Sequence, residues 1–237
     1  MVLTPQDVAD RPEWNFAPVA VCGNAERCLI NLQQAVRFAN HYQKKIIQWR
    51  CELVGIATSL PTHAIDFIYE SNTTTLTFTC VVGSPCFLTE NINVLKGVVN
   101  GTPCKVHSVG YADTNEQEEM QDLLSRSWER VEVLPIVPDF LNVELQGFTT
   151  WDPNDSLLGA EAYVIPIPIA KKRLIIKVRG QQFQAKVHAV DLGFAITFYK
   201  IQGHTLPLLI LNPYKGDVLQ KLILCPYLLD CPGYASQ

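Results

Sequence analysis

The stretch that decides the fold runs from Gly193 to Leu206 and reads GFAITFYKIQGHTL. Its first half is apolar, and the periodicity of that half alone fits a strand or a helix equally well. Its second half turns polar at Gln202 and Gly203. The neighbouring segments decide which kind of fold contains this stretch.

Near the N-terminus the sequence predicts a strand followed by an amphipathic helix. Residues 17–22 are a short apolar strand candidate, and Asn24 is a good N-cap for a helix over about residues 25–42. The predicted helix has apolar residues at helical spacing, namely Leu29, Leu32, Val36 and Ala39. A second short strand is predicted at residues 46–49. A strand, a turn and an amphipathic helix in this order are typical of the start of an α/β unit.

The middle of the chain is predicted to be rich in β-structure. Thr73 to Val82 is rich in β-branched residues, and two further strand candidates flank Asn100-Gly101, the strongest two-residue hairpin signal in the chain. One helix interrupts this region at about residues 116–129. Residues 130–170 hold many prolines and predict loops and edge-like strands.

Two further elements are predicted toward the C-terminus. Leu174 to Val178 and Phe183 to His188 are separated by Arg179-Gly180, which predicts a β-hairpin. Residues 207–211 are a strand candidate. The outline is therefore α/β at both ends with a β-rich insert between them.

The chain has 237 residues, of which 48% are hydrophobic and 18% charged, and this predicts one large or two small globular domains. The formal net charge is −4, so a nucleic-acid contact would need a local basic patch. Such a patch exists between Ala162 and Val190, which contains no acidic residue but holds Lys171, Lys172, Arg173, Lys177, Arg179 and Lys186. Residues 111–123 are conversely acidic. Taken singly, each run is also what a solvated face looks like.

The eight cysteines form no CxxC pair, and no metal site is predicted. There is no apolar run of membrane-spanning length and no basic start followed by an apolar stretch, so we expect a soluble intracellular protein. The five histidines have no nucleophile motif near them, and no catalytic residue is predicted.

The opening stretch resembles the motif A-x-T-I-H-K-S-Q-G-x-T of superfamily 1 DNA helicases of the Pif and RecD type. The positions that match are Ala195, Thr197, Lys200, Gln202, Gly203 and Thr205. Tyr199 replaces the usual His, and Ile201 replaces a small residue. In the family this segment lies in the second RecA-like domain and touches DNA phosphates. The resemblance therefore implies that Thr197, Tyr199 and Lys200 contact DNA and that Gln202 and Gly203 couple this contact to the nucleotide cleft.

Two upstream segments resemble the same family in the same order. Residues 87–102 look like its L-x-x-N…G-L-V-N-G-T element, which belongs to a small Src-homology-type β-barrel that helps to hold the single strand, and this implies DNA contact at Asn100. Residues 21–31 look like the segment that opens the second RecA-like domain, where Arg27 could face phosphate; a solvent-exposed helix Arg is the equally good alternative. We add Lys171, Lys172 and Arg173 as expected DNA contacts from the basic run.

The resemblance implies an α/β fold, a RecA-like second motor domain with an inserted small β-barrel. We expect a lead-in at residues 1–16, the motor domain at 17–72 and 188–237, and the insert at 73–187. The sequence has no G-x-x-x-x-G-K-[ST] loop, and no Arg follows Arg179, so the family's phosphate cradle and arginine finger are both missing. We therefore expect no ATP hydrolysis by this chain alone, and ATP and Mg²⁺ only if a partner chain supplies the first RecA-like domain.

The predicted function is the C-terminal part of an ATP-dependent DNA helicase that binds single-stranded DNA weakly and without sequence preference. The alternatives are a non-enzymatic protein-interaction module and a decayed mobile-element remnant. We expect a nuclear location, with a mitochondrial one as the alternative, and no membrane partner.

Overall fold

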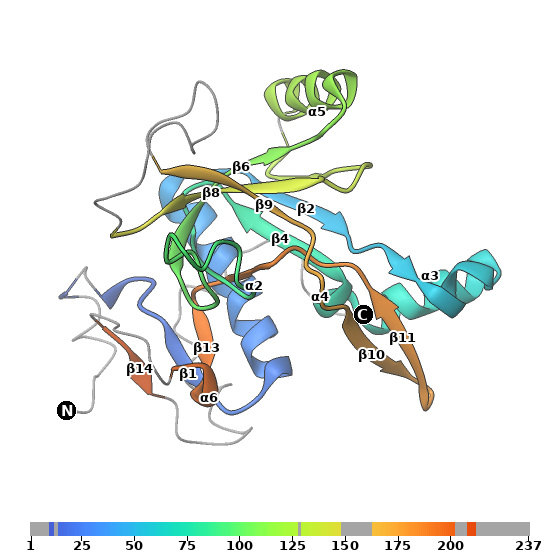
Figure 1. Cartoon of the computed structure of the whole chain (residues 1–237), viewed down its shortest axis with the longest axis horizontal. Coiled ribbons are helices and arrows are strands. Elements are labelled where there is room, and N and C mark those ends of the chain that lie inside the picture. Colours follow the sequence, from blue (N-terminus) through green and yellow to red (C-terminus); the bar gives the residue numbers. More distant parts are fainter. Residues whose placement is uncertain (1–9, 12–13, 128, 148–162, 202–207, 212–237) are drawn as a thin grey trace.

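The computed structural model describes residues 10–11, 14–127, 129–147, 163–201 and 208–211 (Figure 1). Within these residues the chain is a mixed α/β fold with four sheets. The predicted α/β class is therefore confirmed. The boundaries of the predicted domains remain a prediction.

The opening stretch lies in a three-stranded parallel sheet. Strand β1 (Val19–Val21) pairs on one side with β13 (Ala195–Thr197) and on the other with β14 (Ile210–Leu211). Helix α2 (Asn24–Tyr42) follows β1, and a short helix, α6 (Phe198–Ile201), follows β13. The described, apolar part of the stretch is thus a buried strand that pairs with β1 and leads directly into a short helix.

The expected N-cap at Asn24 is wrong. Gly23 occupies the N-cap position with an extended backbone, and Asn24 is the first helical residue. The helix begins one residue earlier than predicted, and glycine is also a common N-cap residue.

A second sheet holds β2 (Ile46–Arg50) between β4 (Thr77–Val81), which is antiparallel to it, and β7 (Val131–Val133), which is parallel. Helices α3 (Thr62–Ser71) and α4 (Thr73–Leu76) precede β4. The first four residues of the predicted strand at 73–82 are therefore helical. The amides of Thr75 and Leu76 both donate to the Asn72 carbonyl, and Leu76 is fully buried, so burial decides the conformation over β-propensity.

The third sheet has five antiparallel strands in the order β12 (Val190–Leu192), β5 (Pro85–Leu88), β6 (Pro103–Gly110), β8 (Phe140–Leu145) and β9 (Val164–Pro168). The proline-containing strand β9 lies at an edge, as predicted. The strand ladder is not a closed barrel among the described residues. Its two edge strands, β9 and β12, do approach each other. Ile169, directly after β9, forms an antiparallel bridge with His188, just before β12.

The expected two-residue hairpin at Asn100-Gly101 is wrong. These residues form a turn closed by the Thr102 amide and the Val99 carbonyl, and of the two only Gly101 has a positive φ, 92°. A type I′ hairpin turn needs positive φ at both positions. Residues 89–102 connect β5 to β6 instead, and the turn packs against the end of β5 through a hydrogen bond from the Gly101 amide to the Leu88 carbonyl.

The predicted hairpin around Arg179-Gly180 is confirmed. Strands β10 (Leu174–Val178) and β11 (Gln181–Ala185) pair in antiparallel register, and β3 (Leu53–Val54) completes this fourth sheet. Arg179 and Gly180 have φ angles of 49° and 83°, as a type I′ turn requires. In Figure 1 this hairpin lies beside α3, with the 3-10 helix η2 (Gly55–Ser59) between β3 and α3 in the chain.

The main apolar core lies between the second and third sheets. It includes Trp49, Leu88, Leu141 and Ile167, each almost completely buried. Helix α5 (Thr114–Arg126) covers one side of it through Met120, and its acidic residues mostly face solvent, which agrees with a solvated acidic face. A separate core binds α2 to the segment before β13 through Phe38 and Phe194. This second core holds the residues just before β13 against α2.

Candidate nucleic-acid interface

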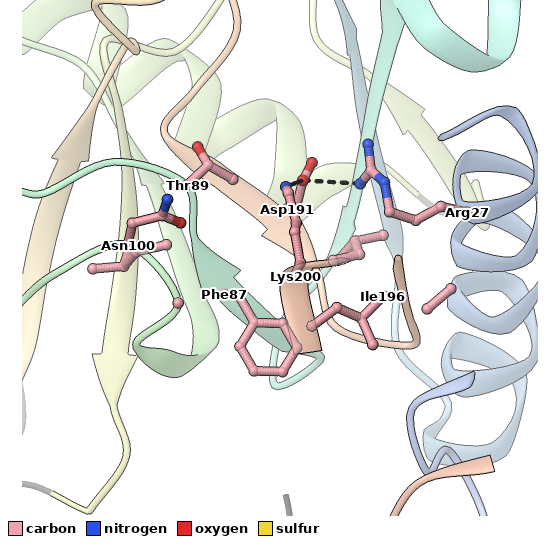
Figure 2. Close-up of a pocket in the computed structure, with 11 residues that line it drawn as sticks. Arg27, Phe87, Thr89, Asn100, Asp191, Ile196 and Lys200 are labelled. Carbon is pink, nitrogen blue, oxygen red and sulfur yellow. Dashed lines mark hydrogen bonds and ion pairs between the residues drawn. The ribbon is translucent and has the colours of Figure 1, made fainter. Parts of the chain in front are cut away.

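A cavity of about 350 Å³ lies where β5, β12, β13 and α6 meet, and we call it the β12 cavity (Figure 2). Its walls include Arg27, Phe87, Thr89, Asn100, Asp191, Ile196 and Lys200. A larger hollow of about 590 Å³, the central groove, shares Arg27, Thr89, Asn100, Asp191 and Lys200 with it and extends to Lys172 and Arg173. Side chains far apart in sequence are therefore brought to one continuous surface.

Two cations in this surface share one carboxylate oxygen. The Arg27 Nη1 atom lies 2.9 Å from Asp191 Oδ2, and the Lys200 Nζ atom lies 3.2 Å from the same oxygen. The side chains of Arg27, Asp191 and Lys200 are 14%, 32% and 35% exposed. Figure 2 shows the Asp191 carboxylate between the two basic groups. One positive charge therefore remains uncompensated within this cluster.

Each member of the cluster is positioned by a different element. Arg27 lies in the first turn of α2, whereas Asp191 lies in β12, where it pairs with Phe87 of β5. Lys200 lies in α6, directly after β13. The start of β13 is fixed to α2 by a hydrogen bond of 2.8 Å from the Ala195 amide to the buried Asn31 Oδ1. This bond links α2, which supplies Arg27, to the strand that leads to Lys200.

The central groove has an excess of positive charge in a chain whose net charge is −4. Its walls contain four permanently basic side chains, Arg27, Lys172, Arg173 and Lys200, and two carboxylates, Glu90 and Asp191. Its one histidine is neutral at pH 7, because burial lowers the pKa of His188 to about 4. Hydroxyl and amide groups also line the groove, among them those of Thr73, Thr74, Thr75, Thr77, Thr79, Gln48 and Asn100. Such a set can bind an anionic backbone. The walls also contain the thiols of Cys28 and Cys51, and burial raises the pKa of both, which disfavours the nucleophilic thiolate.

The basic run from Lys171 to Lys186 does not act as one surface. Lys172 and Arg173 line the groove, whereas Lys171 does not. The backbone amides of Lys171 and Lys172 donate to the Glu90 carboxylate at 3.0 and 2.8 Å, which holds this segment beside the end of β5. Lys186 instead forms an ion pair with Glu52 at 2.7 Å, on the fourth sheet.

Thr197 does not line the groove. Its side chain is fully buried in β13, where the residue pairs with Val21 of β1, and its expected contact with DNA remains a prediction. By contrast, Asn100, Lys172, Arg173, Lys200 and Arg27 lie together as lining residues. The Arg27 side chain is not the solvent-exposed helix Arg of the alternative interpretation, since it is mostly buried against Asp191.

Three expected residues cannot be placed. Gln202 and Gly203 lie outside the described residues, and of Tyr199 only the backbone, in α6, is described. Their expected roles remain predictions. Among the described residues there is no group of three or more metal-binding side chains, and no helix is long and apolar enough to cross a membrane.

Sequence reasoning missed Asp191 and Asn31. Asp191 is the first acidic residue after the acid-free run, and that position was the available signal. Asn31 ends the segment of residues 21–31 that resembles the family, but this match does not indicate its hydrogen-bond partner, because that amide is 164 residues away along the chain.

Gly193 follows the end of β12 and packs closely against β5. A Cβ atom at this position would lie 3.1 Å from Phe87 Cε2, 3.2 Å from the Cys86 nitrogen and 3.2 Å from the Pro85 carbonyl carbon. Two of these neighbours are backbone atoms, so they cannot move aside easily. We expect Gly193→Ala to lower the free energy of unfolding by about 1–3 kcal/mol, as measured by urea titration.

Gly23→Ala is the matched control, because nothing lies within 4 Å of a Cβ built there. Its N-cap position predicts a loss of only about 0.5 kcal/mol. Equal losses for the two variants would contradict the close packing inferred for Gly193.

No family model and no curated protein matches this chain. Several solved structures are similar to it. The Pif1 helicase from Candida albicans has a TM-score of 0.45 and 16% identity, over 82% of this chain and 39% of that one. Unliganded Pif1 from Bacteroides sp. has a TM-score of 0.42 and 14% identity, over 83% of this chain and 46% of that one. Bacteroides Pif1 bound to ssDNA has a TM-score of 0.37 and 13% identity, over 82% and 34%. The chain thus spans less than half the length of these structures.

Proposed function

We propose that this chain is the DNA-contacting second motor region of a Pif/RecD-type ATP-dependent DNA helicase, and that it holds single-stranded DNA in the central groove. The observation that supports this most directly is the gathering of four basic side chains against two carboxylates in a net acidic chain. The motif resemblance in residues 193–206 supports the same proposal independently of the groove. The finer fold assignment, a RecA-like domain with a small barrel insert, belongs to this proposal.

The chemistry of the groove favours recognition of the backbone over recognition of bases. Lysine, arginine, threonine and amide groups all hydrogen-bond to phosphate oxygens, and these contacts carry no sequence information. With two surplus positive charges, the groove would neutralise only a few phosphates. Binding is therefore weak, independent of sequence and strongly dependent on salt.

The 237 residues contain no Gly-Lys-Ser/Thr phosphate loop. We therefore propose that the purified chain does not hydrolyse ATP, and that ATP and Mg²⁺ bind only where a first RecA-like domain is supplied, for example by a partner chain. Strong ATPase activity of the purified chain, stimulated by single-stranded DNA, is the result that would disprove this. The nuclear location, with the mitochondrial alternative, remains a prediction.

A second candidate function is a protein-interaction module. The observation in its favour is the loop between β5 and β6, where Val94 is 65% and Leu95 is 99% exposed. Exposed apolar side chains of this kind mark interaction sites only when they form a larger patch. The DNA-binding test below separates the two functions.

Lys200→Ala tests the proposed groove. We expect the affinity for a dye-labelled oligothymidylate strand at low salt to fall about three- to tenfold, and the slope of log K against log [salt] to become shallower by about 0.7, because one phosphate contact is lost. Fluorescence anisotropy over a KCl series measures both. The combined Lys172→Ala/Arg173→Ala variant is expected to lose roughly twice as much slope.

Lys177→Ala is the matched control, because Lys177 belongs to the same basic run and is exposed but does not line the groove. It removes the same charge and is expected to change affinity little. No binding by the wild-type chain at the lowest salt, or equal losses for Lys177→Ala and Lys200→Ala, would contradict the proposed function.

A further inference from the structure

We propose that Asp191 is an internal competitor of the DNA phosphate: it holds Lys200 when the groove is empty, and a bound strand must take Lys200 from it. This inference rests on the proposed function. It adds that Asp191 lowers the affinity of the groove for single-stranded DNA. It starts from the observation that Arg27 and Lys200 both contact Asp191 Oδ2, at 2.9 and 3.2 Å.

The three side chains differ in their freedom to move. Asp191 is short, and its backbone is fixed by the pairing of β12 with β5. Arg27 is 14% exposed and is embedded between α2 and β12, whereas Lys200 is 35% exposed and has a flexible four-carbon stem. Lys200 is therefore the partner that can turn toward an incoming phosphate, while Arg27 remains paired with Asp191.

The charges around Asp191 make this exchange possible. Arg27, Lys200 and Asp191 are the charged residues of the β12 cavity, so it carries one surplus positive charge. A phosphodiester carries one negative charge and would balance the cluster. From the wider groove the other charged side chains are Lys172, Arg173 and Glu90. The remaining titratable groups are His188, which is neutral, and the thiols of Cys28 and Cys51, whose pKa values are raised by burial.

The same arrangement limits the affinity. A phosphate that approaches Lys200 also approaches the Asp191 carboxylate, and like charges at short range repel. The free energy that Lys200 gains by binding a phosphate is therefore partly offset by the loss of its ion pair with Asp191. Removal of the Asp191 charge should both free Lys200 and abolish the repulsion.

The test is Asp191→Asn, which keeps an oxygen that can accept hydrogen bonds from Arg27 and Lys200 but removes the negative charge. Anisotropy with a dye-labelled oligothymidylate strand over a KCl series is expected to show roughly three- to tenfold tighter binding at low salt than for the wild-type chain, with a similar slope, because Lys200 contacts a phosphate in both bound states. Asp191→Glu keeps the charge and is expected to bind like the wild type. Melting temperatures establish that each variant is folded, and Asp191→Ser replaces the amide variant if that variant does not fold.

Two controls separate competition from a general effect of charge. Asp66→Asn changes the net charge by the same amount at an exposed position on α3, outside the groove, and should leave affinity unchanged. In a Lys200→Ala background the gain from Asp191→Asn should become smaller, because the competition acts through Lys200 and only relief of the direct repulsion remains. Unchanged or weaker binding by Asp191→Asn, with normal wild-type binding, would overturn the competitor role alone. If neither the wild type nor Asp191→Asn binds at low salt, the proposed function fails, and the competitor role fails with it.

Discussion

Acidification from pH 7 to pH 4 is expected to lower the free energy of unfolding by about 3 kcal/mol through His188 alone. The imidazole is 2% exposed, and its Nε2 atom lies 3.0 Å from the Pro138 carbonyl oxygen, to which it donates when neutral. Its ring lies edge-on to Trp49 and Phe78, with centroids 5.4 and 5.8 Å away. Burial in this aromatic setting disfavours the charged form.

The direction of the effect follows from the proton balance. Burial lowers the pKa of His188 from 6.5 to about 4, although the Pro138 carbonyl and the Asp139 charge oppose the shift. Between these values the unfolded chain holds a proton that the folded chain lacks. The stability that depends on the neutral ring is therefore complete above about pH 6.5 and is lost as the pH falls toward 4.

His188→Gln tests this dependence, because glutamine can still donate to the Pro138 carbonyl but does not titrate. Urea unfolding between pH 7 and pH 4 should give a clearly flatter profile for this variant than for the wild type. His63→Gln, at an exposed position in α3, should keep the wild-type profile. A wild-type profile as flat as that of His188→Gln would show that the ring is not a source of acid sensitivity.

Elements fixed by a few adjacent residues could be predicted from the sequence. The β10–β11 hairpin is one, because its turn conformation depends on Arg179 and Gly180 themselves. Helix α2 is another, although only in its position. Its buried residues are Ile30, Asn31, Ala35, Phe38 and Ala39, whereas Leu29 of the predicted apolar face is 41% exposed. The Asn100-Gly101 signal failed because tertiary pairing of residues 101 and 102 with Leu88 placed that turn at the end of a longer connection.

The candidate site could be predicted only in part for the same reason. Lys200, Asn100, Lys172, Arg173 and Arg27 were found through motif resemblance or local charge, and all of them line the groove. Neither source indicates burial, so neither shows that the Thr197 side chain is fully buried. Pairing between distant segments is also invisible in a single sequence, which is why Asp191 was missed.

Asn31→Ala is expected to destabilise the fold by about 2–3 kcal/mol, because it leaves a buried donor without an acceptor. The Asn31 side chain is 6% exposed, and its Oδ1 accepts the Ala195 amide at 2.8 Å. Ala195 itself is 2% exposed, so water does not readily replace the lost oxygen. The loss in free energy of unfolding is larger than for a surface hydrogen bond, because the Ala195 amide stays buried without water or any other acceptor.

The same variant tests whether α2 and β13 act as one unit in the site. Loss of the Asn31 contact should speed hydrogen exchange at the Ala195 amide far more than at amides of the distant β10–β11 hairpin. Asn115→Ala, at an exposed position in α5, is the matched control and should change the free energy of unfolding by less than about 0.5 kcal/mol. Because β13 leads directly into α6, a loosened Ala195 should also leave Lys200 less well positioned. We therefore expect the affinity for oligothymidylate to fall along with the protection of the Ala195 amide against hydrogen exchange. A fall in stability without faster exchange at Ala195 would mean that Asn31 contributes by filling space and not by fixing the strand that carries Lys200.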